Sequence, residues 1–296
     1  MIAGPTAGGK SGLALALAAR LNGVIINADA SQLYADLRVL TARPDVAEET
    51  RVPHRLYGVA DGALPMSAAD WASLARAEIA AAHAQGRLPI LVGGTGMYLE
   101  TLLHGIAPVP EIEPLIRADV RTLSTDAAAT ALAHEDPAMA ARLRPTDRQR
   151  IARALEVMRS TGQSLAHWHG VREGGIASSH DLRGLVVAPP REIRRAAATS
   201  RLQTMIEAGA LTEVERLLAR NLVPDLPVMK ALGVAPLAAH LQGRCTLAEA
   251  VAATLLATHQ YQKRQMTWAR GRLGHWPWLE QPDTEAAITS FLPNKG

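Results

Sequence analysis

A glycine-rich loop near the start of the chain constrains the fold more than any other feature. The run Gly4-Pro5-Thr6-Ala7-Gly8-Gly9-Lys10-Ser11 fits a pattern that cradles phosphate groups when it joins a strand to a helix. Residues 1–3 are apolar and predict the end of a strand, while leucines recur at helical spacing from Leu13 to Leu21 and predict a helix over 11–21. The sequence therefore predicts a strand–loop–helix unit whose loop binds phosphate. The predicted phosphate ligands are Gly4, Thr6, Ala7, Gly8, Gly9, Lys10 and Ser11.

The chemistry of the loop follows from its residue types. Glycines let successive amides turn toward a phosphate, and the helix N-terminus adds a favourable dipole. Lys10 supplies a positive charge and the Ser11 hydroxyl can bind Mg²⁺. The pattern alone predicts a phosphate anhydride held with Mg²⁺, with ATP or GTP as the usual occupant. No clear Walker B acid accompanies it, because the acid at a strand end is Asp29.

Short apolar runs alternate with helical patterns along the chain. Four further strands are predicted, at Val24–Ile26, Leu88–Val92, Leu182–Val187 and His275–Leu279. Ser67 begins a predicted helix over 67–85, with Asp70 as its capping-box partner. This alternation predicts an α/β fold with a parallel sheet flanked by helices. Ligands bind at the carboxyl ends of such strands, where Asp29, Thr95 and the phosphate loop all fall.

The strand signal disappears between 108 and 179. This segment shows helical patterns instead, clearest over 147–160, and Pro and Gly residues bound it at both ends. The sequence therefore predicts a helical insertion at 111–179 within a core formed by 1–110 and 180–296.

The charge is unevenly distributed, although the net charge is only +3. Residues 191–275 carry 12 Lys and Arg against 6 Asp and Glu. Such a segment is either a basic helical surface or a binding surface for a polyanion such as nucleic acid.

The single cysteine, Cys245, excludes a disulfide framework within the chain and a cysteine-rich zinc module. No apolar stretch reaches the ~18 residues needed to span a bilayer. The first residues also lack a secretory pattern, because glycines and a lysine interrupt them. We therefore expect no membrane association and a cytoplasmic location.

Six motifs occur along the chain in the order found in one enzyme family. They are the phosphate loop, Asp29-Ala30-Ser31-Gln32-Leu33-Tyr34, Thr41-Ala42-Arg43-Pro44 with Pro53-His54-Arg55-Leu56, Gly93-Gly94-Thr95-Gly96-Met97-Tyr98, 147–157 and 260–268. On these motifs essentially the whole chain resembles the tRNA dimethylallyltransferases. Three positions depart from the family pattern, since Ala30 replaces a serine, Leu40 a glycine and Val234 a tyrosine, so the contacts of those family side chains are not carried over.

The resemblance implies transfer of a dimethylallyl group from dimethylallyl diphosphate to N6 of adenosine 37 in tRNA, with release of diphosphate. Lys10, the loop amides and Mg²⁺ at Ser11 would stabilise the leaving group. Asp29 is the candidate base that orients the amine and takes its proton; the alternative is a carboxylate that supports Mg²⁺. Thr95 is the candidate orienting hydroxyl, and the alternative is a turn threonine that caps the next helix.

The target adenosine lies in a stacked anticodon loop and must be extruded to be modified. Gln32 is suited to reading its edge, unless it is a solvated loop residue. We expect the helical insertion and the basic segment to hold the anticodon stem-loop, with the enzyme acting as a monomer. The predicted tRNA-binding residues are Asp29, Ala30, Ser31, Gln32, Thr95, Arg117, Asp147, Arg148, Gln149, Arg150, Ile151, Lys263 and Arg264. A solvated or internally paired charge is the alternative for each basic residue.

Two other classes of function are compatible with the loop. A kinase or NTPase acting on a small molecule or nucleotide predicts ATP turnover without prenyl transfer. A non-catalytic RNA-binding protein predicts that Lys10→Ala leaves all activity intact.

Overall fold

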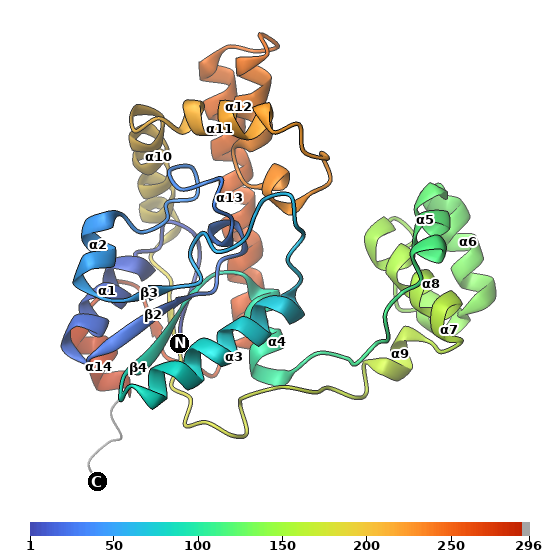
Figure 1. Cartoon of the computed structure of the whole chain (residues 1–296), viewed down its shortest axis with the longest axis horizontal. Helices are drawn as coiled ribbons and strands as arrows, with labels where there is room; N and C mark the ends of the chain where they lie inside the picture. The colour runs from blue at the N-terminus through green and yellow to red at the C-terminus, as the bar shows by residue number, and fades with distance from the viewer. Residues whose placement is uncertain (292–296) are drawn as a thin grey trace. The chain divides into compact units, whose positions relative to one another are not determined.

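The computed structural model describes residues 1–291 and is built around a six-stranded sheet (Figure 1). The strands lie in the order β3-β2-β4-β1-β5-β6, and every neighbouring pair is parallel. Their bounds are β1 Ile2–Ala3, β2 Gly23–Asn27, β3 His54–Arg55, β4 Leu88–Gly93, β5 Leu185–Val187 and β6 Trp278–Leu279. The predicted α/β fold with a parallel sheet is confirmed.

The first strand is short but central. Ile2 of β1 lies opposite Val92 of β4 on one side and Leu185 of β5 on the other. β2 pairs with β4 along its whole length and is buried throughout. The segments that follow β2, β4 and β1 therefore leave three adjacent strands at the same edge of the sheet, which is where parallel α/β sheets bind ligands.

Helices cover the sheet on both faces. Helix α1 (Lys10–Arg20) packs its leucines against Ile25 and Ile90 in one hydrophobic cluster. Because strand side chains alternate, Ile26 points to the other face, where α3 (Ala68–Ala84) packs. The capping box predicted for α3 is confirmed, since its Ser67 and Asp70 each accept the other's amide proton.

The remaining helices of the sheet unit carry much of the site. They are η1 Ala30–Leu33, α2 Val46–Arg51, α4 Gly96–His104, α10 Arg191–Glu207, α11 Ala210–Ala219, η2 Pro227–Lys230, α12 Val234–Leu241, α13 Leu247–Arg272 and α14 Thr284–Phe291. Helix α13 contacts both α10 and α12. Thr246 starts this long helix with a capping box to Glu249.

The chain divides into two compact units, one formed by Met1–Glu100 with Asp181–Gly296 and the other by Thr101–His180. The second unit is helical. Its helices are α5 Pro114–Thr122, α6 Thr125–Glu135, α7 Pro137–Ala140, α8 Arg148–Thr161 and α9 Leu165–Trp168. They enclose a separate hydrophobic cluster that includes Leu132, Ile151 and Leu155.

No helix within residues 1–291 has both the length and the apolar character that crossing a membrane requires. Among the strands within residues 1–291, the sequence does not predict β3, because its two residues, His54 and Arg55, are polar and lie at the edge of the sheet.

Candidate active site

The phosphate loop follows β1 through an unusual backbone. Ala7 and Gly9 adopt left-handed conformations, with φ of +58° and +87°. A Cβ on Gly4, whose φ is +147°, would lie 2.2 Å from the carbonyl oxygen of Val187 in β5. Only glycine therefore lets the loop leave the sheet so close to its neighbour strand. Helix α1 begins directly after Gly9, so its N-terminus faces the loop.

Two buried glutamines of α13 hold the loop in place. The side-chain Nε2 of Gln265 donates to the carbonyl oxygen of Gly94 at 3.1 Å, and its Oε1 accepts from the backbone amide of Thr6 at 2.8 Å. Gln262 donates to the carbonyl oxygens of Thr6 at 2.9 Å and Arg194 at 3.3 Å. Both main-chain groups of Thr6 are thus bound by a helix near the other end of the chain.

Asp29 follows β2 and begins η1. Its Oδ1 accepts from the Ser31 amide at 3.0 Å, and its own amide donates to Oδ1 of Asn27 at 2.8 Å. The Asn27 side chain is buried and also donates to the carbonyl oxygens of Asp29 and Leu56 at 3.0 Å and 2.9 Å. This network holds the Asp29 carboxylate in one orientation.

Three charged groups interact in the site. Burial raises the pKa of the Asp29 carboxyl, while the charges of Lys10 and Arg201 act in the opposite direction. Burial lowers the pKa of Lys10 to about 8, although Asp29 favours its charged form. The Lys10 ammonium donates to the carbonyl oxygen of Pro5 at 2.7 Å. Two cations around one carboxylate leave a net positive field that suits an anionic ligand.

Thr95 lies between β4 and α4, and both its carbonyl oxygen and its hydroxyl form hydrogen bonds. Its carbonyl oxygen accepts from the amides of Tyr98 and Leu99 and so starts the helix. Its hydroxyl oxygen accepts from the Ala30 amide at 3.0 Å, and Tyr261 of α13 is a second side-chain partner of this hydroxyl. The hydroxyl therefore links the ends of β2 and β4, next to Asp29, while the backbone caps the helix.

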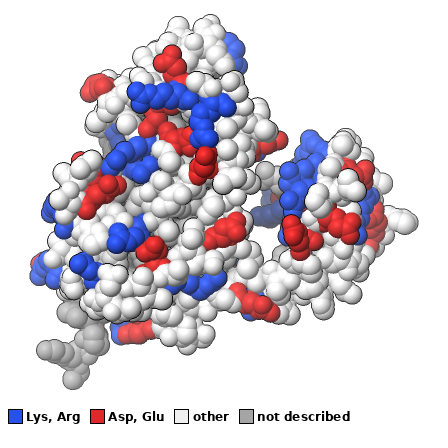
Figure 2. Space-filling view, viewed as in Figure 1, with Lys and Arg blue, Asp and Glu red and all other residues white. Residues whose placement is uncertain are grey.

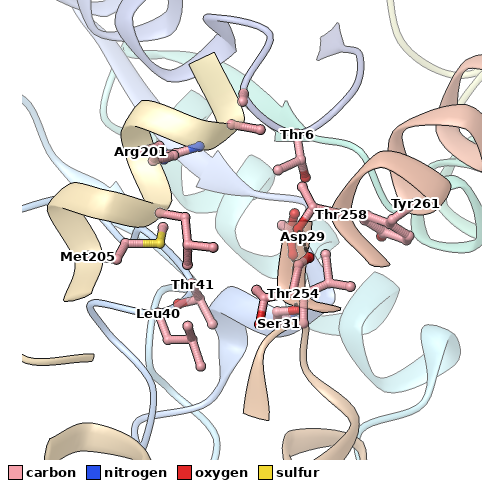
Figure 3. Close-up of a pocket in the computed structure, with 14 residues that line it drawn as sticks. Thr6, Asp29, Ser31, Leu40, Thr41, Arg201, Met205, Thr254, Thr258 and Tyr261 are labelled. Atoms are coloured by element: carbon pink, nitrogen blue, oxygen red, sulfur yellow. Dashed lines mark hydrogen bonds between the residues drawn. The ribbon is translucent and has the colours of Figure 1, made fainter. Parts of the chain in front are cut away.

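A pocket opens beside Asp29 (Figure 3). Its lining combines the phosphate loop and Asp29 with apolar side chains. It is lined by Thr6, Ala7, Asp29, Ser31, Leu40, Thr41, Ala198, Arg201, Leu202, Met205, Leu232, Thr254, Thr258 and Tyr261. A neighbouring cleft extends along Thr6–Gly12 and also contains Tyr57 and Arg201. One continuous region thus offers cations, a carboxylate and an apolar wall.

Several residues of this region were missed by sequence reasoning. Arg201 stands among other arginines of α10, and nothing in the sequence sets it apart from them. Gln262 and Gln265 lie in the motif at 260–268, where the predicted contacts are the charged residues Lys263 and Arg264. Asn27, which holds Asp29, could have been found from the sequence, because it is a polar residue that ends an otherwise apolar strand.

The predicted tRNA contacts near Asp29 are engaged within the chain. The amides of Ala30 and Ser31 donate to Thr95 and Asp29. The side-chain nitrogen of Gln32 donates to the carbonyl oxygens of Thr41 and Ala42, both at 2.9 Å. Both N–H groups of Gln32 can thus be satisfied by the loop, and contact of this residue with a base stays a prediction.

In the helical insertion, one predicted contact requires correction. The Ile151 side chain is 2% exposed and belongs to the core of the insertion, so it cannot face an RNA. Asp147 caps α8 by accepting from the Arg150 amide at 3.2 Å, and a guanidinium nitrogen of Arg148 donates to the Arg121 carbonyl oxygen at 3.2 Å. The exposed members are Arg117, Arg148, Gln149 and Arg150. Figure 2 shows Lys and Arg on the visible face of this unit, with Asp and Glu among them.

Lys263 and Arg264 are exposed on α13. They line a groove together with Gln260, Thr267 and Trp268. The Arg264 guanidinium lies 5.6 Å from the centre of the Tyr261 ring. A groove with cations and an aromatic ring has the composition of a nucleic-acid contact surface.

The described part of the chain contains no group of three or more His, Cys, Asp or Glu side chains that could hold a metal ion by itself. Ser11 and Asp29 nevertheless line the same cleft as the phosphate loop. A hydroxyl and a carboxylate fit Mg²⁺, which commonly keeps several waters and binds substrate phosphates. The donor set is therefore compatible with a Mg²⁺ ion that arrives with its ligand.

Comparison with known proteins identifies relatives over most of the chain. The family model of the IPP transferases matches residues 32–272. A tRNA dimethylallyltransferase of Sphingopyxis alaskensis is 59% identical over 271 residues, 91% of this chain and 89% of that protein. One of Zymomonas mobilis is 53% identical over 91% of this chain and 86% of that protein.

Two solved structures share the fold. The tRNA isopentenylpyrophosphate transferase of Bacillus halodurans superposes with a TM-score of 0.70 at 29% identity, over 98% of this chain and 93% of that one. A eukaryotic dimethylallyltransferase acting on tRNA gives 0.83 at 24% identity, over 96% and 74%. The chain therefore belongs to the IPP transferase family, the family of the tRNA dimethylallyltransferases.

Proposed function

We propose that this chain transfers the dimethylallyl group of dimethylallyl diphosphate to N6 of adenosine 37 in tRNA and releases diphosphate, acting as a monomer. The observation that carries the proposal is the position of Asp29. This carboxylate lies between a phosphate loop and a pocket with an apolar wall. The wall offers an apolar surface for a hydrocarbon chain next to the groups that would hold the diphosphate.

The donor binds with its two ends in different surroundings. The diphosphate lies against the loop amides, where Lys10 and Arg201 neutralise it. The dimethylallyl chain lies against the apolar wall, which includes Leu40, Leu202 and Met205. The Ser11 hydroxyl would hold Mg²⁺ together with the substrate phosphates, and the ion would supply further positive charge beside the leaving group.

The reaction exchanges one bond at C1 and removes one proton from N6. The C1–O bond to diphosphate breaks as the bond from N6 to C1 forms, and N6 loses one proton. The adenine amine is a weak nucleophile, because its lone pair is delocalised into the ring. Asp29 accepts a hydrogen bond from N6–H and takes the proton. Burial raises the pKa of Asp29, which makes this carboxylate a stronger base than an exposed one.

Lys10, Arg201 and the loop amides act on the leaving diphosphate. The charge on the bridging oxygen grows as the C1–O bond lengthens, and fixed cations stabilise that charge more in the transition state than in the ground state. Thr95 orients the amine and the diphosphate, since its hydroxyl already lies between the ends of β2 and β4.

The tRNA anticodon stem-loop is held by basic residues and one glutamine outside the pocket. We assign Arg117, Arg148, Gln149 and Arg150 of the insertion, and Lys263 and Arg264 of α13, to contacts with its backbone. Phosphate contacts of this kind give affinity that falls steeply with salt. The extruded adenosine then enters the pocket beside Asp29.

The test combines an activity assay with one substitution. Unmodified tRNA is incubated with labelled dimethylallyl diphosphate, and its nucleosides are analysed by mass spectrometry. We expect N6-(dimethylallyl)adenosine with the wild type. Asp29→Asn keeps an oxygen for the Ser31 amide but removes the base, so kcat should fall by about 10²–10⁴-fold with tRNA affinity retained.

A stem-loop with guanosine at position 37 serves as the acceptor control and should stay unlabelled. ATP consumption without label in the RNA would refute the proposed function. Loss of tRNA affinity in Asp29→Asn with an unchanged chemical step would instead make Asp29 a binding residue.

A further inference from the structure

Glu213 of α11 binds three consecutive amides of a loop that walls the pocket. Its Oε1 accepts from the amides of Arg38 and Val39, the latter at 2.9 Å. Its Oε2 accepts from the Leu40 amide at 2.8 Å. Hydrogen bonds to an ionised carboxylate are roughly twice as strong as neutral ones, so this contact fixes the backbone of the loop.

The same loop is held from its other side. The Gln32 side chain donates to the carbonyl oxygens of Thr41 and Ala42, and the Thr41 hydroxyl donates to the Leu37 carbonyl oxygen at 2.7 Å. Ala42 adopts a left-handed conformation with φ of +52°, which costs free energy for a residue with a Cβ. A strained loop keeps its shape only while its surroundings impose it, and Glu213 supplies the anchor on the amide side.

The loop sets one wall of the pocket. Leu40 and Thr41 both line it. Leu40 packs against Gly233, because a Cβ on that glycine would come within 3.0 Å of the Leu40 Cδ1 and 3.2 Å of the Thr254 Cγ2. In Figure 3 Leu40 lies with Met205 on the side of the pocket away from Tyr261. The position of this apolar side chain is thus determined from outside the pocket, through its backbone amide.

We propose that Glu213 is a positioning residue that places Leu40 and thereby limits the length of the allylic chain that the pocket accepts. This inference rests on the proposed function, since it assigns the apolar wall to the donor chain. When the Leu40 amide is released, the side chain can withdraw from the wall. Dimethylallyl diphosphate then loses contacts, and a ten-carbon geranyl chain gains room.

Helix α11 has a second anchor that keeps the fold intact in a Glu213 variant. Arg220 pairs with Asp36, just before the loop, and with Asp61 at 2.6 Å. Glu213→Gln keeps one acceptor oxygen but turns the other position into a donor that faces an N–H group. Glu213→Asp keeps the charge but withdraws it by one methylene. Glu215→Gln, at an exposed position of the same helix, is the matched control.

The experiment measures kcat and KM for dimethylallyl and geranyl diphosphate with unmodified tRNA as acceptor. In Glu213→Gln we expect KM for dimethylallyl diphosphate to rise about tenfold, the loss of one charged hydrogen bond. We expect kcat to stay within about threefold, because no reacting group changes. The preference for dimethylallyl over geranyl diphosphate should fall about tenfold, less in Glu213→Asp and not at all in Glu215→Gln.

A merely structural role of Glu213 gives a different pattern. Activity would then fall with the folded fraction, while KM and the preference between donors stayed at their wild-type values in both Glu213 variants, and this result overturns the inference. If Glu213→Gln fails to fold, Glu213→Asp decides between the same two outcomes. Failure of the proposed function is distinct, because the wild type and Glu215→Gln would then leave the tRNA unmodified with either donor.

Discussion

Replacing Gln265 by alanine removes the side chain that joins α13 to both the phosphate loop and the turn after β4. The Thr6 amide loses its acceptor at 2.8 Å, and the Gly94 carbonyl oxygen loses its donor at 3.1 Å. Gln265 is only 6% exposed, so water cannot readily replace it. A buried polar group left without a partner costs about 1–3 kcal/mol. We therefore expect the free energy of unfolding to fall by about 2–4 kcal/mol, which lowers Tm by roughly 3–7 °C in a chain of this size.

The same substitution should affect binding of the donor. Thr6 lines both the cleft of the phosphate loop and the pocket beside Asp29. A loop whose first amides are no longer fixed binds diphosphate less tightly, so KM for dimethylallyl diphosphate should rise. Thermal unfolding and steady-state kinetics measure the two effects. Gln260→Ala, at an exposed position of the same helix, should change stability by no more than about 0.5 kcal/mol.

A third variant separates the hydrogen bonds from the volume of the side chain. Gln265→Met fills most of the space but binds neither Thr6 nor Gly94. We expect it to lose nearly as much stability as Gln265→Ala. Wild-type Tm and KM in Gln265→Met would refute the reasoning, because packing alone would then hold the loop.

Two further predictions concern charge. The free enzyme should lose the Lys10 charge as pH rises through about 8, so KM for dimethylallyl diphosphate should rise above that pH, and Lys10→Met should lack this dependence. The pKa of Lys10 in the folded chain lies below its ordinary 10.5, so the unfolded chain binds more protons between about pH 8 and 10.5. The contribution of Lys10 to the free energy of unfolding therefore rises with pH across that window. Urea unfolding at several pH values checks this. Arg150→Ala should reduce the slope of log affinity for tRNA against log salt concentration by about 1. Arg20→Ala, at the end of α1 remote from the phosphate loop, should leave this slope unchanged. Equal slopes in the two variants would show that Arg150 does not contact the RNA.

The sequence predicts the fold well where local patterns are strong. The phosphate loop needs glycines and a lysine at set spacing, β2 and β4 contain short uninterrupted apolar runs, and the capping residues of α3 stand next to its start. The edge strand β3 escapes prediction, because two polar residues carry no periodicity. The prediction of Ile151 as an RNA contact is wrong, because this residue lies in the apolar stripe of α8 and is buried.

The site is less predictable than the fold, because most of its contacts join distant parts of the chain. Asp29 and Thr95 could be selected since each follows a strand. Arg201 could not, because a guanidinium that lies beside Asp29 looks the same in sequence as one in solvent. The hydrogen bonds of Glu213 to the loop at 38–40 likewise span more than 170 residues and leave no local pattern.

The clamp of Gln262 and Gln265 on Thr6 has a consequence for the order in which the site is made. The hydrogen-bonded residues lie 256 and 259 positions apart. A ribosome adds roughly 5–20 residues per second and domains form from the N-terminal end first. The phosphate loop thus leaves the ribosome long before the helix that restrains it, so a nascent chain spends many seconds with the loop unrestrained. We therefore expect the loop to reach its final geometry only at the end of synthesis, and an incomplete chain that stops before α13 to bind dimethylallyl diphosphate more weakly than the full chain.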